Sequence, residues 1–192
     1  MVYDCFTFFN ELDLLEIRLN TLSDVVDCFV IAEATRTHRG KPKELFFEKN
    51  RTRYAGFLDR IRYIVVDDLL PESEVDEDRY NLPWVNENRQ RNALSRGLED
   101  INDDDVIMLS DVDEIPRPAA VKQALPIAEN GAIVRLLMEM YYYFANFKDF
   151  HDPIWTLGTV MIAGHTFRTT SAFERFICDR FTVASENAGR TI

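Results

Sequence analysis

The stretch "VIMLSDVDEIPRP", residues 106–118, contains the pattern that decides the fold. Five mostly apolar residues run directly into a group of carboxylates at Asp111, Asp113 and Glu114. The two prolines that follow stop the segment from continuing as a strand. Because burying a charge is costly unless something pairs with it, carboxylates at the end of a buried strand indicate a site that recruits a cation.

The rest of the chain alternates between strand-like and helix-like patterns. Predicted strands cover residues 2–9, 27–34, 61–69, 105–111 and 132–144. Predicted helices, with apolar residues at helical spacing, cover residues 12–22, 50–59, 84–100 and 118–128. This alternation predicts an α/β fold with a mostly parallel central sheet and helices on both faces. Beyond residue 141 the sequence shows short segments with no clear helix between them.

The carboxylates fall where such a sheet binds its ligands, beyond the carboxyl ends of the strands. Strand alternation sends Asp111 and Asp113 to the same side and Val112 to the other. Two oxygen ligands suit Mg²⁺ or Mn²⁺, which would bridge them to a diphosphate. The alternative interpretation is a pair of solvated loop acids that cap the following helix. A phosphohydrolase with an aspartyl nucleophile also carries D-x-D, usually near the N-terminus, and is the weaker enzymatic alternative.

Composition narrows the classes of function. The chain has 192 residues and a net charge of -11, which fits one domain and disfavours binding to a nucleic-acid backbone. No segment reaches the roughly 18 uninterrupted apolar residues that a membrane span needs. The three cysteines lack metal-type spacing and the first residues do not resemble a signal peptide. We therefore expect a cytoplasmic protein with reduced thiols.

Four stretches, in this order, closely resemble glycosyltransferase family 17. They are "YDCFTFFNELDLLEIRLNTL" (3–22), "EATRTHRGKPKELFF" (33–47), "NENRQRNALSRGL" (86–98) and "DVIMLSDVDEIPRP" (105–118). The resemblance implies the GT-A fold, a Rossmann-like nucleotide-sugar domain whose D-x-D holds Mn²⁺ or Mg²⁺. It also implies an inverting transferase that moves GlcNAc from UDP-GlcNAc to a glycan acceptor.

The resemblance covers nearly the whole chain, from Tyr3 to about Gly189. It implies one domain, with residues 1–118 forming the nucleotide-sugar and metal half and residues 119–192 the acceptor half. Arg190 and Thr191 stand where family members typically have Trp and His, so we expect a chain shortened at its C-terminus. The alternative function is then a nucleotide-sugar-binding module with little turnover. A homodimer is one way to cover the apolar surface that such a shortening exposes.

The resemblance also gives the other motifs a role in donor binding. Candidate residues for the nucleotide sugar follow the first two predicted strands, lie on the third predicted helix and end the fourth strand: Phe9, Asn10, Glu11, Glu33, Thr35, Arg36, Thr37, Arg91, Asn92 and Asp111. Arg36, Arg39, Lys41 and Lys43 form a basic loop after the second predicted strand, and its cations suit a diphosphate. The alternatives are core packing for the phenylalanines, a solvated loop for the basic residues, and an intrahelical pair with Glu87 for Arg91.

An inverting transferase also needs a base. The metal would stabilise the UDP leaving group, and a carboxylate would take the proton of the acceptor hydroxyl. Candidate carboxylates lie from the fifth predicted strand onward: Glu139, Asp149, Asp152 and Glu174. The sequence does not choose among them. Neighbouring aromatics, including Tyr142 and Phe144, suit either stacking on sugar rings or a hydrophobic core.

Overall fold

A computed structural model describes residues 1–74, 82–141, 148, 154–156 and 158–169. Asp149, Asp152, Glu174, Tyr142 and Phe144 lie outside these residues. Within the described part of the chain, no helix is long and apolar enough to cross a membrane.

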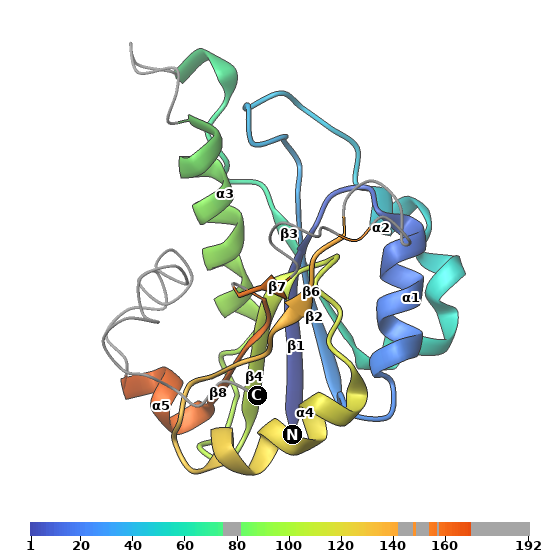
Figure 1. Cartoon of the computed structure of the whole chain (residues 1–192). Coiled ribbons are helices and arrows are strands. Elements are labelled where there is room, and N and C mark those ends of the chain that lie inside the picture. Colours follow the sequence, from blue (N-terminus) through green and yellow to red (C-terminus); the bar gives the residue numbers. More distant parts are fainter. Residues whose placement is uncertain (75–81, 142–147, 149–153, 157, 170–192) are drawn as a thin grey trace.

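A six-stranded sheet forms the centre of the molecule (Figure 1). Its strands lie in the order β3-β2-β1-β4-β8-β5. The first four of these pair in parallel, whereas β8 runs antiparallel to both β4 and β5. Their bounds are β1 Val2–Phe8, β2 Cys28–Ala34, β3 Ile61–Val66, β4 Val106–Asp111, β5 Val134–Arg135 and β8 Val160–Ala163.

The central strands are apolar because both faces of the sheet are covered. All seven residues of β2 are buried, as near-continuous apolar strands in parallel sheets require. β1 lies between β2 and β4, with Thr7 level with Ala32 on one side and Asp111 on the other. The register therefore brings the end of β4 alongside the end of β1.

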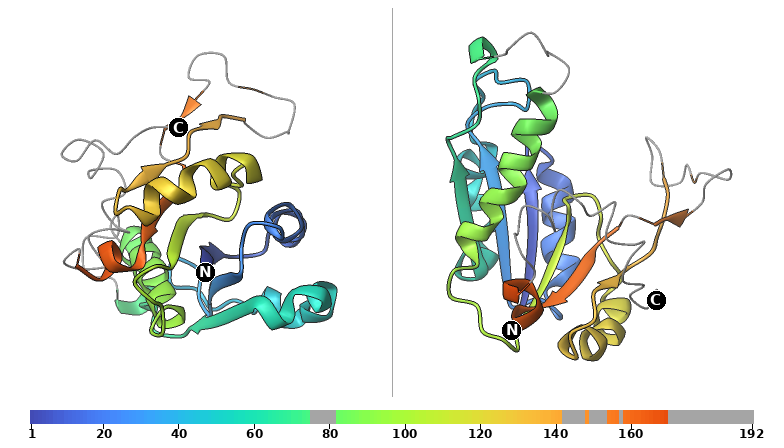
Figure 2. Two further views of the ribbon diagram at one scale, coloured as in Figure 1. Left: turned by 90° about the horizontal axis from the view of Figure 1, so that it is seen from below. Right: turned by 90° about the vertical axis from the view of Figure 1, so that its left-hand side faces the viewer.

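Helices cover both faces: α3 and α1 lie on opposite sides of the sheet in Figure 1, and α3 lies in front of the sheet in the right-hand view of Figure 2. One hydrophobic cluster joins the sheet to α1, α2, η1 and α4, and a second joins it to η3 and α5. The bounds are α1 Leu12–Leu22, α2 Phe46–Lys49, η1 Arg51–Arg60, η2 Glu72–Glu74, α3 Leu82–Asn92, η3 Ala93–Gly97, α4 Pro118–Glu129 and α5 Gly164–Thr169. The predicted α/β class, with a mostly parallel sheet and helices on both faces, is confirmed.

The predicted single strand over residues 132–144 is wrong. Val134 and Arg135 pair with β8, and the Leu136 N–H then donates to the Thr159 carbonyl at 2.8 Å. After this bond the chain leaves the central sheet. β6, Met138–Glu139, pairs instead with β7, Ile154–Trp155, in a separate two-stranded sheet. Periodicity could not reveal this exit, because the residues stay apolar on both sides of it.

Candidate functional site

A cleft of about 710 Å³ opens where β1 and β4 end. The strand order reverses here, because β2 and β3 extend the sheet on one side of β1 and β4 lies on the other. Ligand sites of open α/β sheets form at such a switch point. Thr7 on β1, Phe9 just after it and Asp111 at the end of β4 all line the cleft.

Asp111 and Asp113 both line this cleft, as does Val112 between them. Asp111 is the last residue of β4, and residues 111–115, here called the D-x-D turn, reverse the chain behind it. The Glu114 N–H donates to the Asp111 carbonyl at 3.1 Å, and the Ile115 N–H donates to the Asp113 carbonyl at 3.1 Å. The Asp111 N–H in turn donates to the Glu114 carboxylate at 2.9 Å. These bonds fold the turn tightly around its own backbone.

The carboxylates concentrate negative charge at the turn. Burial raises the pKa of Asp113 above its usual range, and the neighbouring charges of Asp111 and Glu11 raise it further. A cation between the carboxylates would relieve this repulsion. No group of three or more His, Cys, Asp or Glu side chains suited to a metal occurs among the described residues. An ion held by the two aspartates alone would have to take its remaining ligands from water and a diphosphate, as Mg²⁺ commonly does.

Arg91, on α3, lines the cleft beside the carboxylates of Glu87 and Asp111. Its guanidinium lies 2.5 Å from the Glu87 carboxylate and 3.0 Å from that of Asp111. Burial opposes its charge, but Asp111 and Glu87 outweigh burial and raise the Arg91 pKa. The intrahelical pair with Glu87, given above as the alternative to a role in donor binding, is therefore present together with a contact to a D-x-D carboxylate.

The basic loop after β2 supplies further cations to the cleft. Arg36, Arg39 and Lys41 line it, together with Thr37 and His38. The Gly40 N–H donates to the Thr37 carbonyl at 2.8 Å, and Gly40 adopts a φ of 80°, which favours glycine. A tight turn therefore holds these cations in one loop.

Two side chains of α3 fasten the basic loop. Asn86 donates from its amide to the His38 carbonyl at 3.0 Å. The Gln90 amide nitrogen donates to the carbonyls of Phe8 and Ala32, which leaves its oxygen to accept from the His38 Nε2–H at 2.9 Å. These bonds tie the loop to the ends of β1 and β2.

Glu33 is not among the residues that line the cleft, and its surroundings do not favour the predicted contact with the nucleoside. Its side chain is fully buried and accepts from Lys43 Nζ at 2.8 Å and from the Tyr63 hydroxyl at 2.9 Å. The backbone N–H groups of Phe46 and Phe47 also donate to it, at 2.6 and 3.0 Å. With both oxygens occupied, Glu33 anchors the start of α2 to the end of β2.

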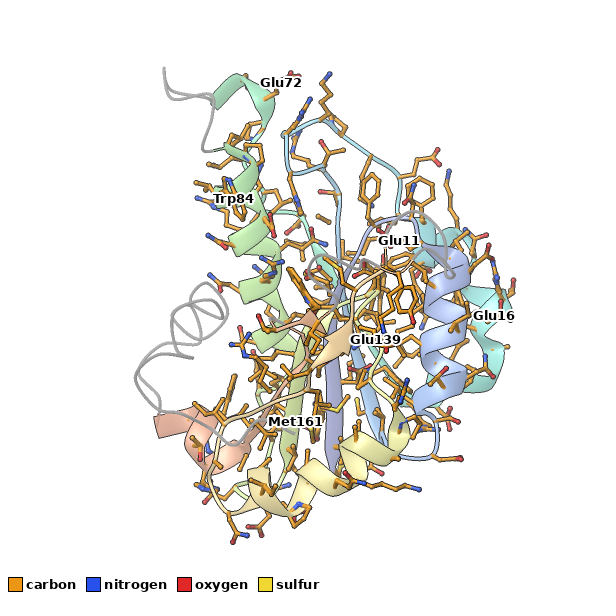
Figure 3. The ribbon with its side chains drawn as sticks, in the orientation of Figure 1. Glu11, Glu16, Glu72, Trp84, Glu139 and Met161 are labelled. Atoms are coloured by element: carbon orange, nitrogen blue, oxygen red, sulfur yellow. The ribbon has the colours of Figure 1, made fainter. Side chains whose placement is uncertain are left out.

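Of the remaining residues predicted to bind the nucleotide sugar, some line the cleft and others do not. Phe9 and Glu11 line the cleft, and Figure 3 places Glu11 at the start of α1. Glu11 accepts from the N–H groups of Phe9 and Asn10 at 3.0 and 2.9 Å, so it fixes the chain between β1 and α1. Asn10, Thr35 and Asn92 are not among the lining residues.

A second cavity of about 710 Å³ adjoins the D-x-D turn, and Asp113 lines both. Glu139 lies on β6 (Figure 3). It lines this second cavity together with Tyr141 and Lys148. Lys148 donates to Glu139 at 2.5 Å and the Tyr141 hydroxyl donates to it at 2.7 Å. These two hydrogen bonds, Lys148 first, lower the pKa of Glu139 and make its carboxylate a weaker base.

Several residues that organise the site were not among the predicted candidates. Glu114 was named only as one of three carboxylates, but it also accepts from the Trp155 indole N–H at 2.6 Å and so links the D-x-D turn to β7. Arg18 and Asp4 form a buried pair beneath the same turn. The signal for both was present, since Asp4 interrupts an apolar strand and Arg18 shares helical spacing with Leu15 and Leu22.

The fold and the cleft define an α/β protein of the GT-A type with a mixed acidic and basic site at the switch point of its sheet. A crystal structure of S. aureus TarS, residues 1–349, has the same fold, with a TM-score of 0.52 at 10% sequence identity. The comparison covers 99% of this chain and 56% of that one.

The sequence comparisons give the family. The sequence model of glycosyltransferase family 17 matches residues 1–170, and the chain belongs to this family. It is similar to the human β-1,4-mannosyl-glycoprotein 4-β-N-acetylglucosaminyltransferase, with 31% identity over 113 residues. The mouse protein of the same name is 30% identical over 113 residues. These matches cover 56% of this chain and only 20% of each relative.

Proposed function

We propose that this protein is a metal-dependent inverting glycosyltransferase that moves GlcNAc from UDP-GlcNAc to a glycan acceptor. The observation that carries the proposal is the composition of one cleft. Both D-x-D carboxylates and the cations of the basic loop line it, at the switch point of a family 17 chain. The donor sugar and the glycan acceptor are proposed from the names of the human and mouse relatives.

The cleft has separate groups for each part of a nucleotide sugar. Arg36, Arg39 and Lys41 are suited to hydrogen bonds with phosphate oxygens. Asp111 and Asp113 would hold Mn²⁺ or Mg²⁺, which neutralises charge on the leaving diphosphate when it is bound. Phe9, with a half-exposed ring, offers an apolar face to the nucleoside.

Arg91 gives the site a cation of its own near the metal position. It is held by Glu87 and Asp111, so its charge is available beside the D-x-D pair before any ligand enters. A donor diphosphate would offer Arg91 a third anionic partner within the same cleft. We therefore assign Arg91 to the binding of the leaving group rather than to the acceptor.

The transfer needs a base on the acceptor side. The acceptor oxygen forms a bond to the anomeric carbon, the bond from that carbon to the UDP phosphate oxygen breaks, and the hydroxyl proton passes to a carboxylate. The second cavity adjoins the donor cleft at Asp113 and is where we place the acceptor. Because Lys148 and Tyr141 already satisfy Glu139, we favour Asp152 or Glu174 as the base over Glu139.

Product analysis tests the proposal. The protein would be incubated with Mn²⁺, a mannosyl-glycan acceptor and UDP-GlcNAc, GDP-mannose or a CMP-sugar in separate reactions. We expect a glycan heavier by one GlcNAc only with UDP-GlcNAc, with an anomeric configuration opposite to that of the donor. Transfer from GDP-mannose in place of UDP-GlcNAc would contradict the proposed donor, and a retained configuration would contradict the inverting mechanism.

A further inference from the structure

Arg18 is a fully buried arginine in the middle of α1. It faces the sheet with Leu15, Leu19 and Leu22, which are also fully buried. Its guanidinium makes a two-pronged ion pair with the Asp4 carboxylate on β1, with both N···O distances at 2.7 Å. Asp4 is likewise fully buried, so neither charge is screened by water.

The other N–H groups of Arg18 all reach the end of β4 and the D-x-D turn. Nη1 donates to the carbonyls of Asp111, Val112 and Glu114, at 2.9, 3.2 and 3.0 Å. Nη2 also donates to the Ser110 hydroxyl. One side chain therefore holds the backbone on both sides of Asp113, on the side of the turn that faces the core.

The geometry points to Arg18 and Asp4 as a positioning pair that fixes the D-x-D turn for its ligand. Arg18 donates to the three carbonyls of the turn, and the ion pair with Asp4 fixes the orientation of the guanidinium group. This inference rests on the proposed function, because it assigns the pair to the cation and diphosphate site. Neither residue lines the cleft, so the pair acts through the turn and not on the ligand.

Stability alone does not account for the choice of residues. Replacing a buried ion pair by apolar residues of similar size is often neutral or stabilising, whereas removing one partner leaves an unpaired charge. Lysine could not take the place of Arg18, because it has three donors at one point and lacks the planar fork. The arginine instead supplies five N–H groups in fixed directions, and these reach the two Asp4 carboxylate oxygens, the Ser110 hydroxyl and three carbonyls of the D-x-D turn.

Two variants and a matched control test the inference. The first variant, Arg18→Met with Asp4→Leu, removes both charges together. The second, Arg18→Lys, keeps the charge and the pairing with Asp4 but loses the fork. The control, Arg62→Met with Asp100→Leu, removes an ion pair whose arginine also donates to a backbone carbonyl, that of Gly97, and none of its residues lines the cleft.

Calorimetry of UDP with Mn²⁺, amide hydrogen exchange and urea unfolding would be measured on each variant. We expect both Arg18 variants to bind UDP and Mn²⁺ about 10–100-fold more weakly, the usual effect of losing a group that orients metal ligands. Exchange should accelerate at the amides of Asp111, Glu114 and Ile115, while the control matches the parent protein in affinity and in exchange at these amides.

The outcomes separate the inference from the function on which it rests. If the parent protein shows no metal-dependent UDP binding, the proposed function fails, and amide exchange in the turn alone decides whether the pair positions it. Unchanged affinity and exchange in a folded double variant would overturn the inference. If the double variant does not fold, Arg18→Lys decides, and parent-like affinity and exchange in that variant would overturn it equally.

Discussion

At the scale of single residues, the site depends on how the charges at the D-x-D turn are paired. Asp111 is held by Arg91, whereas Asp113 has a raised pKa and lines both cavities. In this turn the Asp111 carboxylate is paired with Arg91, whereas the Asp113 carboxylate lies close to other negative charges. This imbalance is what we expect of a site that completes itself with a cation.

Substitution of Arg91 tests its assignment to the leaving group. We expect Arg91→Gln to weaken the binding of UDP with Mn²⁺ by about 10–100-fold, since a charge-assisted hydrogen bond contributes about 1.5–3 kcal/mol. Arg89→Gln is the control, because Arg89 is exposed on the same helix and donates to the Asp68 carbonyl. Equal affinities of the two variants, measured by calorimetry, would rule out this role for Arg91.

Glu33 provides a second test at this scale. Glu33→Gln leaves buried Lys43 without an anionic partner, and breaking such a pair costs about 3–5 kcal/mol of unfolding free energy. Glu44→Gln removes an exposed pair with Lys49 and should cost less than about 1 kcal/mol. Urea unfolding measures both. If Glu33→Gln keeps its stability but loses UDP affinity, Glu33 contacts the donor after all.

At the scale of elements, the basic loop depends on its packing against the chain that follows β3. Gly40 lies at the tip of this loop, and a Cβ there would stand 2.3 Å from the Glu72 backbone nitrogen. The loop can therefore approach Glu72 only because residue 40 has no side chain. The same residue adopts the positive φ that closes the turn.

Gly40→Ala should lower stability by about 1–3 kcal/mol, the cost of holding a residue with a side chain in a strained backbone region. Gly56→Ala is the control, since a Cβ at Gly56 meets nothing within 4 Å. Displacement of the loop should also weaken UDP binding, because Arg36, Arg39 and Lys41 move with it. Thermal unfolding with and without UDP measures both effects, and parent-like behaviour of Gly40→Ala would show that the loop tolerates a different path.

The elements also show what the sequence could predict. Strong periodicity placed the first helix at Leu12–Leu22, and apolar runs placed the four parallel strands. The exit at Leu136 was hidden, since it depends on a backbone bond to a distant residue. The hydrogen-bond partners of Glu33 could not be predicted from the sequence for a related reason. Donors from α2 and β3 reach its carboxylate only after folding.

For the candidate site, local pattern found the residues that end strands and missed those that support them. Asp111 and Asp113 could be predicted because an apolar strand ends at them. Arg18 could have been predicted as buried from its helical spacing, but its contact with the D-x-D turn spans 93 residues or more of sequence. Long-range polar contacts of this kind have no signature in a short window of sequence.

At the scale of the whole molecule, the chain combines a net charge of -11 with a cleft that contains a basic loop. The sheet brings the loop after β2 and the turn after β4 to the same cleft, where the proposed diphosphate would find both cations and metal ligands. The central claim is that these groups form one site, in which the donor nucleotide and the metal bind together.

Calorimetric titration of UDP tests this claim most directly. We predict tight binding with Mn²⁺, a large loss of affinity with EDTA, and the same loss for Asp113→Asn in the presence of Mn²⁺. Ligand at about 100 times its dissociation constant should also add about 2.7 kcal/mol to the unfolding free energy. Equal affinity for UDP with Mn²⁺ and with EDTA, unchanged by Asp113→Asn, would contradict the account.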